Sequence, residues 1–144
     1  MTQSVLLQRA RIMSFSALWV LLGVCSASNA HADEPLVIEV LERSDCAHCQ
    51  EEKKFLADLA VQRDDFSVKL YNIDGDGKDL FMKITALERL PKATPITIVG
   101  GTVLQGFDTA DTTGKRMELL LDASMGKEQV TFERYLAMSR DHRA

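Results

Sequence analysis

Residues 36–49 read Leu-Val-Ile-Glu-Val-Leu-Glu-Arg-Ser-Asp-Cys-Ala-His-Cys, an apolar run followed by two closely spaced cysteines. Residues 36–41 are almost all apolar, which predicts a mostly buried strand. A helix is predicted from about residue 47 to 61, with its apolar side chains on one side. The two thiols, Cys46 and Cys49, therefore fall where a strand has ended and a helix begins.

The rest of the chain continues to alternate strands and helices. Further strands are predicted at 66–73, 95–99 and 102–105, a helix at 78–90, and one or two helices within 111–140 that Gly126 separates. Gly100-Gly101 is a hairpin signal between the last two strands. The order β-α-β-α-β-β-α plus an extra C-terminal helix predicts an α/β fold: a mixed four-stranded sheet flanked by helices.

The N-terminus has the three parts of a secretory signal peptide. Arg9 and Arg11 form a basic start, residues 15–25 are largely apolar, and Ala30-His31-Ala32 resembles a cleavage site. We therefore predict a signal peptide at 1–32 and one domain at 33–144. The apolar run is shorter than the roughly 20 residues that a membrane-spanning helix needs. An uncleaved anchor and lipid attachment at Cys25 are the less favoured alternatives.

The predicted mature domain is acidic. Arg9 and Arg11 are the only charged residues in 1–32, so residues 33–144 keep 15 basic and 21 acidic residues, a net charge of −6. An acidic domain argues against nucleic acid or an anionic membrane as a partner. Export places the domain in an oxidising compartment, which we expect to be the periplasm.

The spacing of the two cysteines favours reversible chemistry over a structural role. A disulfide between Cys46 and Cys49 would close a very small loop, so its entropic stabilisation would be small. A closed zinc site needs about four ligands, whereas the mature chain offers two cysteines and two histidines. We therefore expect no zinc site, while copper(I), which needs fewer ligands, stays open as an alternative.

Three motifs resemble those of the thioredoxin superfamily, and within it a small glutaredoxin-type member. They are Cys46-Ala47-His48-Cys49 after the first strand, Thr94-Pro95 before the third, and Gly100-Gly101 followed by Gly106-Phe107-Asp108. The similarity covers about residues 35–122. It implies a thioredoxin-like fold with a cis peptide bond before Pro95.

The resemblance also implies roles for individual residues. Cys46 would be the nucleophile, since free N–H groups at a helix start favour a thiolate, and Cys49 would be the resolving thiol. His48 resembles the histidine found there in disulfide isomerases and periplasmic disulfide oxidases. Thr94 and Pro95 would offer backbone groups to an extended substrate.

Members of this superfamily often bury an acid near the resolving cysteine. Glu39 and Glu42 precede the cysteines on the predicted first strand and could each accept a proton, and Glu39 is the candidate named here. Solvated strand residues are the alternative interpretation.

These features predict an exported thiol:disulfide oxidoreductase that acts on cysteine-containing protein substrates, with no cofactor besides its redox-active disulfide. Arg43 stands where glutaredoxins place a basic residue toward glutathione, but Gln105 and Thr109 replace a glycine and an aspartate of their pattern, which argues against glutathione. The alternatives are a dedicated dithiol reductant in cytochrome or metalloprotein maturation, served by a membrane electron donor, and a non-catalytic copper-binding module.

Overall fold

The computed structural model describes residues 35–141. Its elements are β1 (Leu36–Glu42), α1 (Ala47–Gln62), β2 (Phe66–Asn72), α2 (Lys78–Glu88), β3 (Ile96–Val99), β4 (Thr102–Gln105), the π-helical turn η1 (Ala110–Gly114), α3 (Lys115–Ser124) and α4 (Phe132–Asp141). The predicted signal peptide and its cleavage site lie outside the described residues. Among the residues described, no helix is long and apolar enough to cross a membrane.

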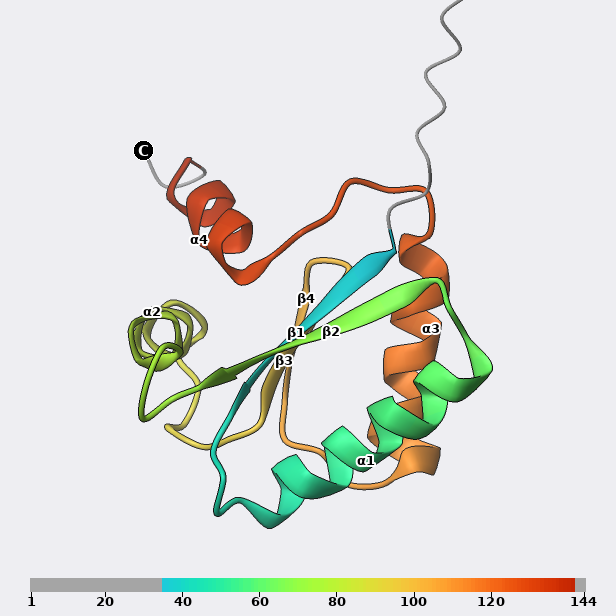
Figure 1. Cartoon of the computed structure of the whole chain (residues 1–144). Helices are drawn as coiled ribbons and strands as arrows, with labels where there is room; N and C mark the ends of the chain where they lie inside the picture. Colours follow the sequence, from blue (N-terminus) through green and yellow to red (C-terminus); the bar gives the residue numbers. More distant parts are fainter. Residues whose placement is uncertain (1–34, 142–144) are drawn as a thin grey trace, which may run out of the picture. The chain divides into compact units, whose positions relative to one another are not determined.

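The four strands form one mixed sheet in the order β2-β1-β3-β4. β1 runs parallel to β2 and antiparallel to β3, and β4 pairs antiparallel with β3 through the Gly100-Gly101 turn. The predicted fold class is confirmed: an open four-stranded mixed sheet with helices, consistent with a thioredoxin-like arrangement (Figure 1).

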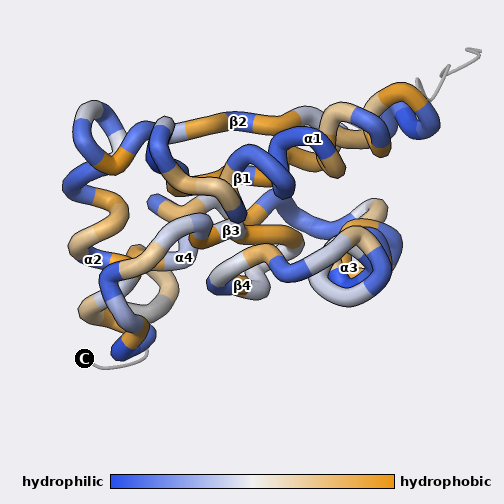
Figure 2. The backbone as a smooth tube through the Cα atoms, turned by 90° about the horizontal axis from the view of Figure 1, so that it is seen from below, coloured by the Kyte–Doolittle hydropathy of each residue, from blue (hydrophilic) through white to orange (hydrophobic). Residues whose placement is uncertain are grey.

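Helices cover both faces of the sheet. α1 and α3 pack on one face and α2 and α4 on the other (Figure 1). Successive strand side chains point to opposite faces, so Ile38 and Val40 enter the first core and Leu41 enters the second. Figure 2 shows hydrophobic positions concentrated along the strands between these helix layers.

The helix boundaries differ slightly from the sequence prediction. α2 ends at Glu88 because Arg89 takes a left-handed conformation with φ 54°, two residues before Pro91. The predicted last helical region divides into α3 and α4, and Gly126 lies between them with φ 68°. The π-helical turn η1 before α3 has no counterpart in the sequence prediction.

Two side chains attach the segment after α3 to the central strand. Gln129 exchanges two hydrogen bonds of 2.9 Å with the backbone N–H and C=O of Val37. This contact lies beyond the part of β1 that pairs with β3, which spans Glu39 to Leu41. Glu39 Oε2 accepts the backbone N–H of Phe132 at 2.7 Å, at the start of α4. The C-terminal helix is therefore held by hydrogen bonds to β1 as well as by apolar packing.

The loop between β2 and α2 contains two glycines with different surroundings. A Cβ added at Gly77 would lie 2.9 Å from Tyr71 Cβ and 3.0 Å from the Asn72 carbonyl oxygen, whereas one at Gly75 would come no closer than 3.8 Å to any atom. We predict that Gly77→Ala lowers the free energy of unfolding by about 1–3 kcal/mol. Gly75→Ala should change it by less than about 0.5 kcal/mol. Urea denaturation of both variants tests this, and equal effects would contradict the packing described.

Candidate redox site

The two cysteines form a disulfide at the N-terminus of α1. Cys46 is the N-cap residue and is half-buried, whereas Cys49 is fully buried. Their Cα atoms are 5.2 Å apart, within the usual range for a disulfide. His48 lies between them and is exposed. Of the two sulfurs, only that of Cys46 belongs to a residue that a large partner can reach.

The backbone at the start of α1 interacts with the Cys46 sulfur. The N–H of Cys49 donates a hydrogen bond to Cys46 Sγ at 3.1 Å. Helix N-termini leave such N–H groups without helical partners, and the helix dipole favours negative charge there. A thiolate formed at Cys46 on reduction would find this backbone donor already in place.

The loop that contains Thr94 and Pro95, here called the proline loop, lies next to the Cys46 sulfur. The Thr94–Pro95 peptide bond is cis, and the Thr94 carbonyl oxygen lies 3.5 Å from Cys46 Sγ. Gln105 Nε2 donates hydrogen bonds to the carbonyls of Pro91 at 2.7 Å and Ala93 at 3.1 Å, and so fixes this loop. The structure thus brings together Cys46, Cys49, Thr94 and Pro95. Gln105, which departs from the glutaredoxin pattern, holds the loop in place.

Glu39 lies on the opposite face of the sheet from α1. Its carboxylate is buried, accepts the Tyr71 hydroxyl at 2.9 Å and the Phe132 N–H at 2.7 Å, and lies 3.8 Å from Lys69 Nζ. Neither interpretation made from the sequence describes this position: Glu39 is not solvated, and it faces the helix layer that lacks the dithiol. Its contacts give it a structural role in docking α4.

A different carboxylate, Glu52, lies on the dithiol side. Glu52 follows Cys49 by three residues on α1, so both side chains share one face of the helix, and both are buried. Thr97 Oγ1 donates a 2.6 Å hydrogen bond to Glu52 Oε1, and Glu52 Oε2 is buried without a hydrogen-bond partner among the described residues. Burial raises the pKa of Glu52 from 4.5 to about 7, because desolvation outweighs the opposing effect of the Thr97 hydrogen bond.

Two further charged residues near the dithiol are neutralised by ion pairs. Glu42, the last residue of β1, receives Lys53 Nζ from α1 at 2.9 Å. The exposed Arg43 guanidinium pairs with Asp45. Arg43 is therefore engaged within its own loop. Among the described residues, Glu52 forms no ion pair with a cationic side chain, and its carboxylate accepts a hydrogen bond from Thr97 alone.

The sequence contained a signal for Glu52. Cys49, Glu52, Leu56 and Leu59 recur at helical spacing and are the buried positions of α1. A charged residue within an apolar stripe is a candidate for a perturbed pKa. A glutamate near the start of a predicted helix is also explained by the helix dipole, so the sequence pattern alone does not single out Glu52.

Comparison with known proteins adds no family assignment. No protein-family model, curated protein or solved structure matches the chain. Within residues 35–141, no group of three or more His, Cys, Asp or Glu side chains is placed to hold a metal ion. The geometry of the cysteine pair, the proline loop and Glu52 is thus the basis for the function proposed below.

The raised pKa of Glu52 predicts a specific dependence of stability on pH. The folded-state pKa of Glu52, about 7, exceeds its unfolded value of 4.5. The contribution of Glu52 to the free energy of unfolding is therefore fully present below about pH 4.5 and is lost as the pH rises through about 7. Glu52→Gln cannot ionise and avoids that loss. The free energy of unfolding of the oxidised wild type, relative to Glu52→Gln, should therefore fall by up to about 3 kcal/mol between about pH 4.5 and pH 8.

The matched control for this measurement is Glu51→Gln, which removes the exposed carboxylate of the preceding residue. Its stability relative to wild type should show no comparable dependence on pH in urea denaturation. A flat difference between wild type and Glu52→Gln across the same pH range would show that Glu52 is not the titrating group.

Proposed function

We propose that the protein is an exported thiol:disulfide oxidoreductase of the thioredoxin superfamily that exchanges disulfides with protein substrates in the periplasm. The observation that carries this proposal is the Cys46–Cys49 disulfide at the start of α1, with Cys46 Sγ 3.5 Å from the Thr94 carbonyl. A close cysteine pair in this fold is compatible with a redox-active dithiol. The signal-peptide pattern and the acidic mature domain support the proposed compartment.

The oxidised protein would transfer its disulfide in two balanced steps. A substrate thiolate attacks Cys46 Sγ, the Cys46–Cys49 bond breaks, and Cys49 leaves as a thiolate that takes up a proton. A second substrate thiolate then attacks the substrate sulfur of the mixed disulfide, and Cys46 leaves as a thiolate. The substrate loses two electrons, which the dithiol carries. The reverse sequence reduces a substrate disulfide.

Thr94 and Pro95 would position the substrate for this exchange. An extended substrate chain can pair with backbone groups of the loop, as strands add to a sheet edge. The half-buried Thr94 carbonyl lies beside the reactive sulfur, and Gln105 holds the loop that carries it. Substrate recognition would therefore depend mainly on backbone contacts, which suits a protein that acts on more than one sequence.

Glu52, rather than Glu39, would exchange the proton with Cys49. The Glu52 carboxyl and the Cys49 thiol are both buried, one helical turn apart on the same face of α1. A carboxyl with a pKa of about 7 can act as acid and as base near neutral pH. It would protonate the Cys49 thiolate in the oxidising direction and accept the Cys49 proton in the reducing direction.

The first test is to trap the mixed disulfide. Cys49→Ala removes the resolving thiol, so complexes linked through Cys46 should accumulate in cells and be visible on non-reducing gels after acid quenching. Cys46→Ala should trap little, because Cys49 is fully buried. The Cys46→Ala/Cys49→Ala variant gives the background, including any from Cys25 of precursor whose signal peptide is still attached. Equal trapping by all three variants would overturn the proposed roles.

A second test isolates Glu52 in the resolving step. In the reduction of insulin disulfides by the prereduced protein, Glu52→Gln should slow attack by Cys49 at least about tenfold at neutral pH. The defect should shrink at alkaline pH, where hydroxide can remove the thiol proton without the Glu52 carboxylate. Glu51→Gln should match wild type throughout. A loss that is equal at every pH would assign Glu52 a purely structural role.

A further inference from the structure

The face of the sheet opposite the dithiol carries a groove between α2 and α4. Its volume is about 660 Å³, in the range of sites that hold a ligand. The lining residues come from the end of β2, the loop after it and both helices: Tyr71, Asp76, Asp79, Leu80, Lys83, Ala86, Leu87, Glu133 and Leu136. The redox mechanism proposed above uses none of them.

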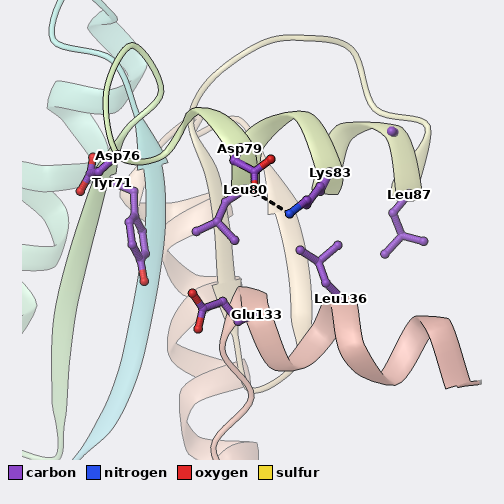
Figure 3. Close-up of a pocket in the computed structure, with 9 residues that line it drawn as sticks. Tyr71, Asp76, Asp79, Leu80, Lys83, Leu87, Glu133 and Leu136 are labelled. Atoms are coloured by element: carbon purple, nitrogen blue, oxygen red, sulfur yellow. Dashed lines mark hydrogen bonds and ion pairs between the residues drawn. The ribbon is translucent and has the colours of Figure 1, made fainter.

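Leucine side chains from both helices line part of this groove. Figure 3 shows Leu80 and Leu87 of α2 and Leu136 of α4 pointing into the space between the two helices. Leu80 and Leu87 are seven residues apart, which corresponds to about 10 Å along a helix. A ligand that covers both must be equally long. An amphipathic helix presents apolar side chains at the same spacing, at positions i and i+7.

The rim of the groove is acidic. It has three carboxylates, from Asp76, Asp79 and Glu133, against one ammonium group, that of Lys83. Lys83 already pairs with Asp79 at 2.5 Å (Figure 3). Lys69, which interacts electrostatically with Glu133, also lies 3.8 Å from buried Glu39. The remaining negative charge of the rim complements a cationic side chain.

We propose that this groove binds an amphipathic helical segment of a partner protein, with leucine-like side chains against the groove leucines and arginine or lysine side chains against Asp76 and Glu133. This arrangement is the helix-in-groove mode of recognition. One end of the groove also lies beside the dithiol loop. Asp76 Oδ1 accepts the Asn72 N–H at 3.0 Å, and Asn72 Nδ2 donates to Ser44 Oγ at 3.3 Å, two residues before Cys46. A partner bound here would thus lie close to the edge of the redox site.

The test uses a defined probe on the full-length chain. The probe is an alanine-based helical peptide of about 16 residues with leucines at i, i+4 and i+7 and arginines beside them. We expect saturable binding that shifts the methyl NMR resonances of Leu80, Leu87 and Leu136 but leaves those of Leu56 and Leu121, which lie in the other core, in place. The same peptide with glutamate in place of arginine should bind at least tenfold more weakly.

A matched pair of variants tests the charge of the rim. Glu133 and Glu118 each lie in the first turn of a helix, α4 and α3 respectively, but only Glu133 lines the groove. Glu133→Lys should weaken binding of the arginine peptide at least tenfold, and Glu118→Lys should change it less than twofold. Binding should be unchanged in Cys46→Ala/Cys49→Ala, so a failure of the redox proposal would leave this result intact.

Several results would overturn the proposal. One is the absence of saturable binding, and another is a set of resonance shifts confined to leucines outside the groove. Equal affinity for the arginine and glutamate peptides, or equal effects of Glu133→Lys and Glu118→Lys, would also contradict it. Self-association would also overturn it, if sedimentation showed a dimer and the groove resonances shifted with protein concentration, because the groove would then be occupied by a second copy.

Discussion

The burial of β1 on both faces is the constraint on which the rest of the structure depends. β1 lies between β2 and β3, and helices cover both of its faces. A charged side chain on such a strand must find partners inside the protein, because leaving it unpaired would cost several kcal/mol. Glu39 meets this requirement through Tyr71 and Phe132, and Glu42 does so through Lys53. The two carboxylates of β1 therefore help to position α4 and α1.

The dithiol is built where three separate segments meet. The end of β1 leads into the first turn of α1, which supplies Cys46 and the Cys49 N–H. The proline loop brings the Thr94 carbonyl to the same sulfur, and Thr97 on the following strand reaches Glu52. Burying a carboxyl with one unpaired oxygen opposes folding. Such a local conflict with stability is typical of functional positions and supports a chemical role for Glu52.

The two faces of the sheet differ in their use of charge. On the α1 and α3 face, Glu42 is paired with Lys53 and Glu52 is shielded from water. On the α2 and α4 face, carboxylates and leucines line an open groove. Asn72, the last residue of β2, connects the two regions through hydrogen bonds to Ser44 and Asp76. One small domain thus presents a chemical site and a separate surface suited to recognition.

The order of the elements and the position of the cysteines between the first strand and the first helix could be predicted from the sequence alone. Local patterns suffice for this, because apolar alternation marks the strands, helical spacing marks α1 and α2, and Gly100-Gly101 marks the hairpin. The π-helical turn η1 and the early end of α2 at Arg89 escaped prediction, since both depend on backbone conformations that residue type does not dictate. Only the tertiary structure decided which carboxylate accompanies the dithiol. Glu39 accepts a hydrogen bond from Phe132, which is 93 positions away in the sequence. Glu52 accepts one from Thr97, which is 45 positions away. Alternation shows which residues of a strand share a face, but the face that receives each helix is fixed by packing between segments distant in the chain.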